Sequence, residues 1–169
     1  GVSYATASAA QKNAWTAATA DGVLFGRMAS NYNATHATAL NAITATETLD
    51  RATVSKLKAI ARSAKAANGE GITPHIYGED HETYVPFVGT RAFRDLKLDM
   101  ASVLAEAEKR GKENPLFTGG NSLWWDDVII REVPSIAAFD NTASTAIPVE
   151  PMYLCGAQAV GIAWAMTTK

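Results

Sequence analysis

The sequence predicts a mixed α+β domain in which helices pack on a small sheet. A segment at 48–67 has apolar residues at helical spacing, and β-rich segments follow it at 84–88 and 128–130. An uncharged run from 152 to 166 closes the chain. Such a run is too short to span a membrane, which needs about 20 apolar residues. We expect it to be buried, because each large apolar side chain contributes about 1.5–3 kcal/mol on burial.

The first predicted helix covers residues 8–29, where residues three and four apart form one apolar face. That face consists of Trp15, Ala18, Gly22, Phe25 and Met28. Residues 31–46 lack a strong period and are predicted to form a long loop, with one helical turn at 37–43.

The second predicted helix covers residues 48–67 and begins at Thr48 or Asp50, either of which can cap it. Asn68 and Gly69 form a natural stop. The buried stripe of this helix consists of Val54, Leu57, Ala61 and Ala64. A second stripe is cationic and consists of Arg51, Lys58, Arg62 and Lys65.

The remaining predicted elements alternate between strands and helices. Within a loop at 70–82 we expect a strand at 74–77, and a further strand at 84–88. Since Pro86 lacks an N–H group, the strand at 84–88 is expected at a sheet edge or at a bulge. Two helices are expected at 91–98 and 100–110, followed by a turn at 116–121. One or two strands are expected at 123–133, then a loop at 137–151 and a last strand at 152–155.

Composition limits the functional classes. Apolar residues make up 47% and charged residues 19% of the 169 residues, and the formal net charge is -2. This charged share is low for a small monomer, so we expect part of the surface to be covered by a partner. The balance of charge does not mark the chain as a nucleic-acid binder. By composition the chain has three parts: residues 1–46 are nearly uncharged, residues 47–113 are densely charged, and residues 114–169 are again poorly charged.

No catalytic motif is predicted, and no cofactor or metal. The densest polar cluster consists of His75, Glu79, Asp80, His81 and Glu82. Of these, His75, Glu79 and His81 could serve a small metal-dependent hydrolase. The two histidines lie six residues apart, without the helical spacing of a known zinc motif, and a solvated loop explains them equally well.

Two further features remain open as binding sites. Asp126 and Asp127 follow Trp124 and Trp125, and we interpret the aspartates as a polar turn before the next strand. A binding module that uses the two tryptophans is an alternative. The cationic stripe Arg51, Lys58, Arg62 and Lys65 is a candidate contact for DNA or for a neighbouring subunit, although charged helix faces are more often only solvated.

Three groups of segments resemble, in order, the major capsid proteins of tailed bacteriophages. The first is ADGVLFG at 20–26, and the second is YVPFVGTRAFRDLK at 84–97. The third is the most specific and comprises NPLFTG at 114–119, VIIRE at 128–132 and LCGAQAVGIAW at 154–164. The likeness is greatest to the podovirus-type branch, which has the shell fold shared with the Hong Kong 97 phage and with encapsulins.

This resemblance implies a Hong Kong 97-like capsid fold, present here as a fragment. Residues 1–46 would hold the end of the peripheral-domain spine helix with its loop, and residues 47–169 the core of the axial domain. The implied function is self-assembly, in pentamers and hexamers, into an icosahedral head that encloses double-stranded DNA without sequence specificity.

The same resemblance implies partners and a location. Portal and scaffolding proteins are further partners that it suggests, and it implies no membrane. The protein would assemble in the host bacterial cytoplasm and reside in the virion. An encapsulin-like compartment that encloses protein is the alternative within the same fold.

Overall fold

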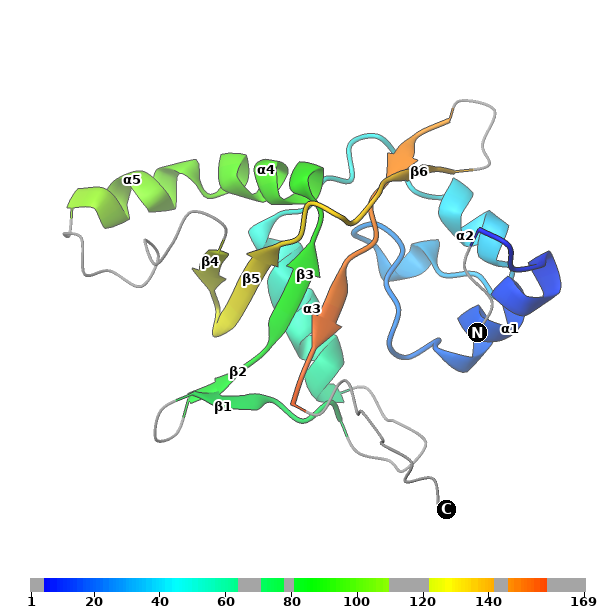
Figure 1. Cartoon of the computed structure of the whole chain (residues 1–169), viewed down its shortest axis with the longest axis horizontal. Coiled ribbons are helices and arrows are strands. Elements are labelled where there is room, and N and C mark those ends of the chain that lie inside the picture. Colours follow the sequence, from blue (N-terminus) through cyan, green and yellow to red (C-terminus); the bar gives the residue numbers. More distant parts are fainter. Residues whose placement is uncertain (1–4, 64–70, 78–80, 110–121, 142–145, 158–169) are drawn as a thin grey trace, which may run out of the picture.

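The protein is described here from a computed structural model, which describes residues 5–63, 71–77, 81–109, 122–141 and 146–157 (Figure 1). The first elements are α1 (Ala9–Ala18), the 3-10 turn η1 (Ala29–Asn31), α2 (His36–Asn41), α3 (Arg51–Ser63), β1 (His75–Tyr77), β2 (His81–Thr83) and β3 (Val85–Val88). They are followed by α4 (Thr90–Asp99), α5 (Ala101–Lys109), β4 (Ser122–Trp125), β5 (Val128–Glu132), β6 (Phe139–Asp140), β7 (Pro148–Val149) and β8 (Tyr153–Cys155).

A four-stranded sheet with the order β4-β5-β3-β8 forms the centre of the molecule. β4 and β5 make an antiparallel hairpin, β3 runs parallel to β5, and β8 runs antiparallel to β3. Figure 1 shows α3 behind this sheet, with α4 and α5 end to end along its upper margin. Two separate two-stranded sheets, β1-β2 and β6-β7, complete the described strands. The mixed α+β class is therefore confirmed.

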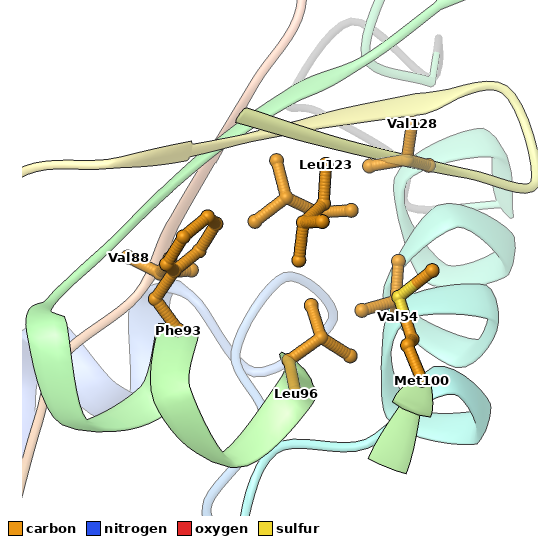
Figure 2. Close-up of a cluster of buried hydrophobic side chains, with 8 residues drawn as sticks. Val54, Val88, Phe93, Leu96, Met100, Leu123 and Val128 are labelled. Carbon is orange, nitrogen blue, oxygen red and sulfur yellow. The ribbon is translucent and has the colours of Figure 1, made fainter. Parts of the chain in front are cut away.

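The main core lies between the sheet and helices α3 and α4 (Figure 2). The side chains of the core alternate along the strands, so that Val88 of β3 is buried while Phe87 faces outward. The buried cluster consists of Val54, Val88, Phe93, Leu96, Met100, Leu123, Val128 and Ile130. Burial of these large side chains, at about 1.5–3 kcal/mol each, is the main source of stability of this part of the chain.

The predicted edge position or bulge of the strand with Pro86 is wrong, because β3 lies between β5 and β8. Tyr84 pairs with Val128 and Phe87 with Arg131 at the same offset, so no residue is inserted between them. The parallel ladder is interrupted between these two pairs, where Pro86 has no N–H group to donate. Pro86 is itself buried in this central strand.

The first helix is shorter than predicted: it begins after Ser8, which forms a capping box with Gln11, and it ends at Ala18. Thr19 closes it, because its hydroxyl donates to the Trp15 carbonyl at 2.9 Å. The predicted apolar face is only partly correct. Phe25 is buried, but Trp15 and Met28 are 51% and 56% exposed.

A second, smaller core surrounds Phe25 and contains Ala39, Leu40 and Ile43. The helical turn predicted within the loop at 31–46 is confirmed as α2, which supplies two of these residues. Phe139 and Val149 of the β6-β7 hairpin pack against the same core. That hairpin lies in the segment predicted as a loop, and strands of two residues are too short for periodicity to indicate them.

The carboxylate of Glu47 joins the turn after α1 to the segment that leads into α3. It accepts hydrogen bonds from Thr44 N at 2.7 Å, Asn31 Nδ2 at 2.9 Å and Arg27 N at 3.2 Å. Burial alone would raise the pKa of Glu47, but these donors outweigh it and hold the pKa below its ordinary value. Gly26, with φ 64°, leaves the room that this carboxylate occupies.

The other predicted elements lie close to their observed positions. α3 begins at Arg51, with the Asp50 carboxylate accepting from Thr53 N at 2.8 Å, and α4 and α5 confirm the two helices predicted at 91–98 and 100–110. The strand at 74–77 is confirmed as β1, although its partner β2 was not predicted. β4, β5 and β8 confirm the later strands. The C-terminal end of the helix predicted at 48–67, the turn at 116–121 and most of the closing run lie outside the described residues.

Candidate functional site: the cationic face of helix α3

The predicted cationic stripe lies on α3 and just beyond it. Arg51, Lys58 and Arg62 belong to the described helix, and Lys65 lies outside the described residues. Val54 and Ala61 of the same helix are both buried. With about 3.6 residues per turn, they lie on the face next to the cations, so the cationic stripe runs along the border of the buried face of α3.

Lys58 binds the hairpin turn between β4 and β5. Its Nζ donates to the Asp126 carbonyl at 2.8 Å, to Asp126 Oδ1 at 3.0 Å and to Asp127 Oδ2 at 3.0 Å. Its side chain is only 13% exposed. Burial alone would lower the pKa of Lys58, but the hydrogen bonds and charges of Asp127 and Asp126 outweigh it and raise the pKa above its ordinary value.

The turn that Lys58 binds has an unusual backbone. Trp125 pairs with Val128, so Asp126 and Asp127 are the two central residues of a tight hairpin. Both have positive φ, 50° and 56°, a conformation in which non-glycine residues are uncommon. The polar turn predicted from the sequence is confirmed. The two carboxylates converge on one ammonium group of the same chain.

Arg51 is tied to the end of α4. Its backbone N and its Nε donate to Asp99 Oδ2 at 3.0 Å and 2.9 Å, and its guanidinium lies 5.5 Å from the centre of the Trp125 ring. The hydrogen bond from the Arg51 backbone is the largest cause of the lowered pKa of Asp99. A shallow recess of about 330 Å³ lies here, lined by Asp50, Arg51, Ala52, Ser55, Asp99 and Trp125.

Arg62 forms an ion pair with Glu82 of β2. Their side chains are 55% and 51% exposed, so water screens the pair and its contribution to stability is small. Of the three described cations, Arg62 is the one whose side chain is most accessible to a partner.

Sequence reasoning found the cations but missed their partners. The carboxylates of Asp99, Asp126 and Glu82 come from three other elements far along the chain. No local pattern could have indicated these pairs, because the order of the strands and the packing of α4 bring them together.

His75 and His81 lie on the exposed β1-β2 hairpin, whereas Glu79 lies outside the described residues. Within the described ranges, no three His, Cys, Asp or Glu side chains are grouped closely enough to hold a metal ion. Trp124 and Trp125 are half-buried on β4. Among the described helices, none is both long and apolar enough to cross a membrane.

The described fold is similar to that of a solved phage capsid chain. A family model described as "Phage capsid protein" matches residues 2–169. A solved chain from the cyanophage Pam1 capsid asymmetric unit is 38% identical, with a TM-score of 0.76, over 93% of this chain and 44% of that chain. A chain from the capsid of Ralstonia phage GP4 is 21% identical, with a TM-score of 0.58, over 81% of this chain and 37% of that chain. A comparison with curated proteins finds no match.

The class defined by this fold is that of bacteriophage capsid proteins. The chain belongs to the phage capsid protein family, whose model covers nearly all of it. It spans less than half the length of the two solved capsid chains that it resembles. Neither match favours a protein-filled compartment or a hydrolase.

Proposed function

We propose that this chain is part of a major capsid protein, which self-associates into the icosahedral head of a tailed phage and encloses double-stranded DNA. The observation that carries the proposal is the likeness to the Pam1 capsid chain, at 38% identity and a TM-score of 0.76 over 93% of this chain. The low charged share of 19% supports it, because a subunit in a closed shell covers much of its surface with neighbours.

In this proposal the protein acts structurally and not as an enzyme. Copies meet in pentamers and hexamers through head-to-tail contacts, and burial of apolar area between copies supplies the free energy of assembly. Residues 1–46 form the end of the spine helix with its loop, and residues 47–169 the axial domain. Portal and scaffolding proteins join the assembly in the host cytoplasm, and the product is the virion.

The experiment for this function is sedimentation of the product of the complete reading frame that encodes this sequence, expressed with its neighbouring genes. Fast-sedimenting particles that protect DNA from nuclease are expected. Particles that hold protein and no nucleic acid would favour the compartment, and slowly sedimenting monomers under every condition would contradict the proposal.

We further propose that Arg62 contacts packaged DNA or a neighbouring subunit. Its exposure supports this, because its guanidinium remains accessible beside Glu82. Lys58 and Arg51 are candidates for the same contact, but their ammonium and guanidinium groups already bind Asp126, Asp127 and Asp99. Lys65 is a candidate on the sequence pattern alone.

Reversing the charge of Arg62 is expected to lower the yield of DNA-filled particles, with little change in the stability of the subunit. The measurement is the ratio of filled to total particles for Arg62→Glu. The matched control is the swap Arg62→Glu with Glu82→Arg, which restores an ion pair between α3 and β2. If Arg62 contacts a partner, the swapped chain should still give a low ratio of filled to total particles. Full recovery in the swap would mean that Arg62 serves only its pair with Glu82.

A further inference from the structure

His36, the first residue of α2, is buried against α1 with 5% of its surface exposed. Its Nδ1 lies 2.8 Å from Thr16 Oγ1, and the Thr16 hydroxyl donates to the Lys12 carbonyl at 2.9 Å. Because a hydroxyl has one proton, which the bond to Lys12 uses, Thr16 Oγ1 accepts from His36 Nδ1–H. The backbone N of His36 also donates to Asn13 Oδ1 at 2.9 Å.

The surroundings of this imidazole disfavour a positive charge. The rings of Trp15 and Phe25 meet it edge-on, with centroids 5.9 Å and 5.6 Å away. On α1, the charged group that acts on the ring is Lys12, which is also positive. Among the described residues after α1, Tyr32 brings a titratable phenol to this contact, and its hydroxyl donates to the Thr16 carbonyl at 3.3 Å. Burial first, and then Lys12, lower the pKa of His36 below its ordinary value of 6.5.

The contacts that hold α1 in place are few. Thr16 is the one residue of α1 that is buried, and it is the residue that binds His36. The apolar side chains of the second core come from outside α1, and the main core lies between the sheet, α3 and α4. An element with so little buried surface belongs to the part of a protein that opens most easily.

We propose that His36 is an acid-sensitive latch. While the ring is neutral it holds α1 on α2; Nδ1 already carries a proton, so the added proton binds Nε2, and the charged ring gains hydration when α1 is released. The open state takes up a proton near pH 6.5, whereas the closed state resists it until lower pH. The free energy that neutral His36 contributes to the closed state is therefore fully present above pH 6.5. It is lost as pH falls from 6.5 through the pKa of His36 in the closed state. The main core has no part in this step, so the sheet with α3 and α4 stays folded.

The test is NMR on the 169-residue chain, with His36 ring shifts followed from pH 8 to pH 4.5 and amide exchange measured for α1. After correction for intrinsic exchange, opening of α1 is expected to increase by up to tenfold per pH unit between 6.5 and the pKa of the closed state. Amides of α3 and β5 are expected to be unaffected in the same range. His75 and His81, both exposed, serve as references in the same spectra.

Two variants separate the latch from general acid sensitivity. His36→Gln cannot take up the proton and should abolish the acid increase. Lys12→Gln removes the neighbouring positive charge, so it should raise the protonation midpoint of His36 and reduce the increase. Protonation of His36 at or above pH 6.5 in the native chain would overturn the proposal. Acid opening that persists unchanged in His36→Gln, or in Lys12→Gln if the first variant does not fold, would also overturn it.

Discussion

Replacing Gly156 by alanine is expected to destabilise the protein by about 3 kcal/mol, the upper end of the usual cost of overpacking. A Cβ at this position would lie 2.2 Å from the Thr73 carbonyl oxygen and 2.6 Å from Ile72 Cγ2. The oxygen belongs to the backbone and cannot rotate away, and it also accepts from Ala157 N at 2.7 Å. The change would therefore separate the end of β8 from the segment that leads into β1.

Gly22→Ala is the matched control. Its nearest heavy atom would be the Thr19 carbonyl oxygen at 3.9 Å, so the methyl group meets no obstacle. Urea unfolding should show a stability close to that of the native chain for Gly22→Ala, and a clear loss for Gly156→Ala. Equal stability of the two variants would show that the close approach of Gly156 and Thr73 does not occur.

Replacing Lys58 by methionine is expected to cost about 2 kcal/mol, within the range measured for hydrogen bonds to charged groups. Methionine keeps the apolar stem of the side chain but loses three hydrogen bonds to Asp126 and Asp127. The two carboxylates would then face each other across a turn whose φ angles are already positive. Because the two aspartates are exposed, the expected loss of stability is smaller than that of breaking a fully buried ion pair.

A rescue distinguishes this explanation from general damage to α3. Changing Asp126→Asn and Asp127→Gly in the Lys58→Met chain supplies the residues that such a hairpin prefers and removes both charges. Most of the lost free energy of unfolding should return. A Lys58→Met chain as stable as the native one would contradict the proposed role of Lys58, and so would an ineffective rescue.

The same contact should make stability depend on acid. Burial alone would raise the pKa of Asp126, but the hydrogen bonds from Lys58 and Ser55 and the charge of Lys58 outweigh it and lower the pKa. This contribution to stability is present above the ordinary carboxyl pKa and is lost as pH falls through the lower pKa of the folded state. Lys58→Met should therefore lose less stability than the native chain between pH 5 and pH 3, as urea unfolding at each pH would show.

Helices α3, α4 and α5 could be predicted because their signals are local. Val54 and Ala61 recur at helical spacing, and Gly89 interrupts the chain just before α4. The length of α1 could not be predicted, because Gly22, Phe25 and Met28 continue the helical period after the helix has ended. Thr19 closes the helix through its hydrogen bond to the Trp15 carbonyl, and the apolar period does not register such a contact.

The order of the strands was likewise beyond local reasoning. Pro86 indicated that β3 lies at an edge of the sheet. In the structure β8, some 70 positions later in the chain, pairs with β3 and covers that side. The resemblance to capsid proteins indicated the family, which no local pattern did, and two glycines in the resembling segments show a physical reason. A Cβ on Gly89 would meet the Glu150 carboxylate, which caps α4 by accepting from Ala92 N at 2.9 Å, and a Cβ on Gly156 would meet Thr73.

The candidate site was predicted only in part. The cations of α3 were identified by their spacing, yet three of them bind carboxylates of their own chain. Whether Arg62 also binds a partner depends on surfaces that one chain does not contain. The domain division at residue 46 stays a prediction, and the β6-β7 hairpin, from beyond that division, packs on the core around Phe25.

The most direct measurement is a single-particle reconstruction of whatever the complete reading frame assembles into. We expect closed icosahedral shells in which every subunit shows the sheet β4-β5-β3-β8 with α3 and α4 on one face. Soluble monomers under all conditions, or particles whose subunit density does not accommodate this sheet, would contradict this expectation.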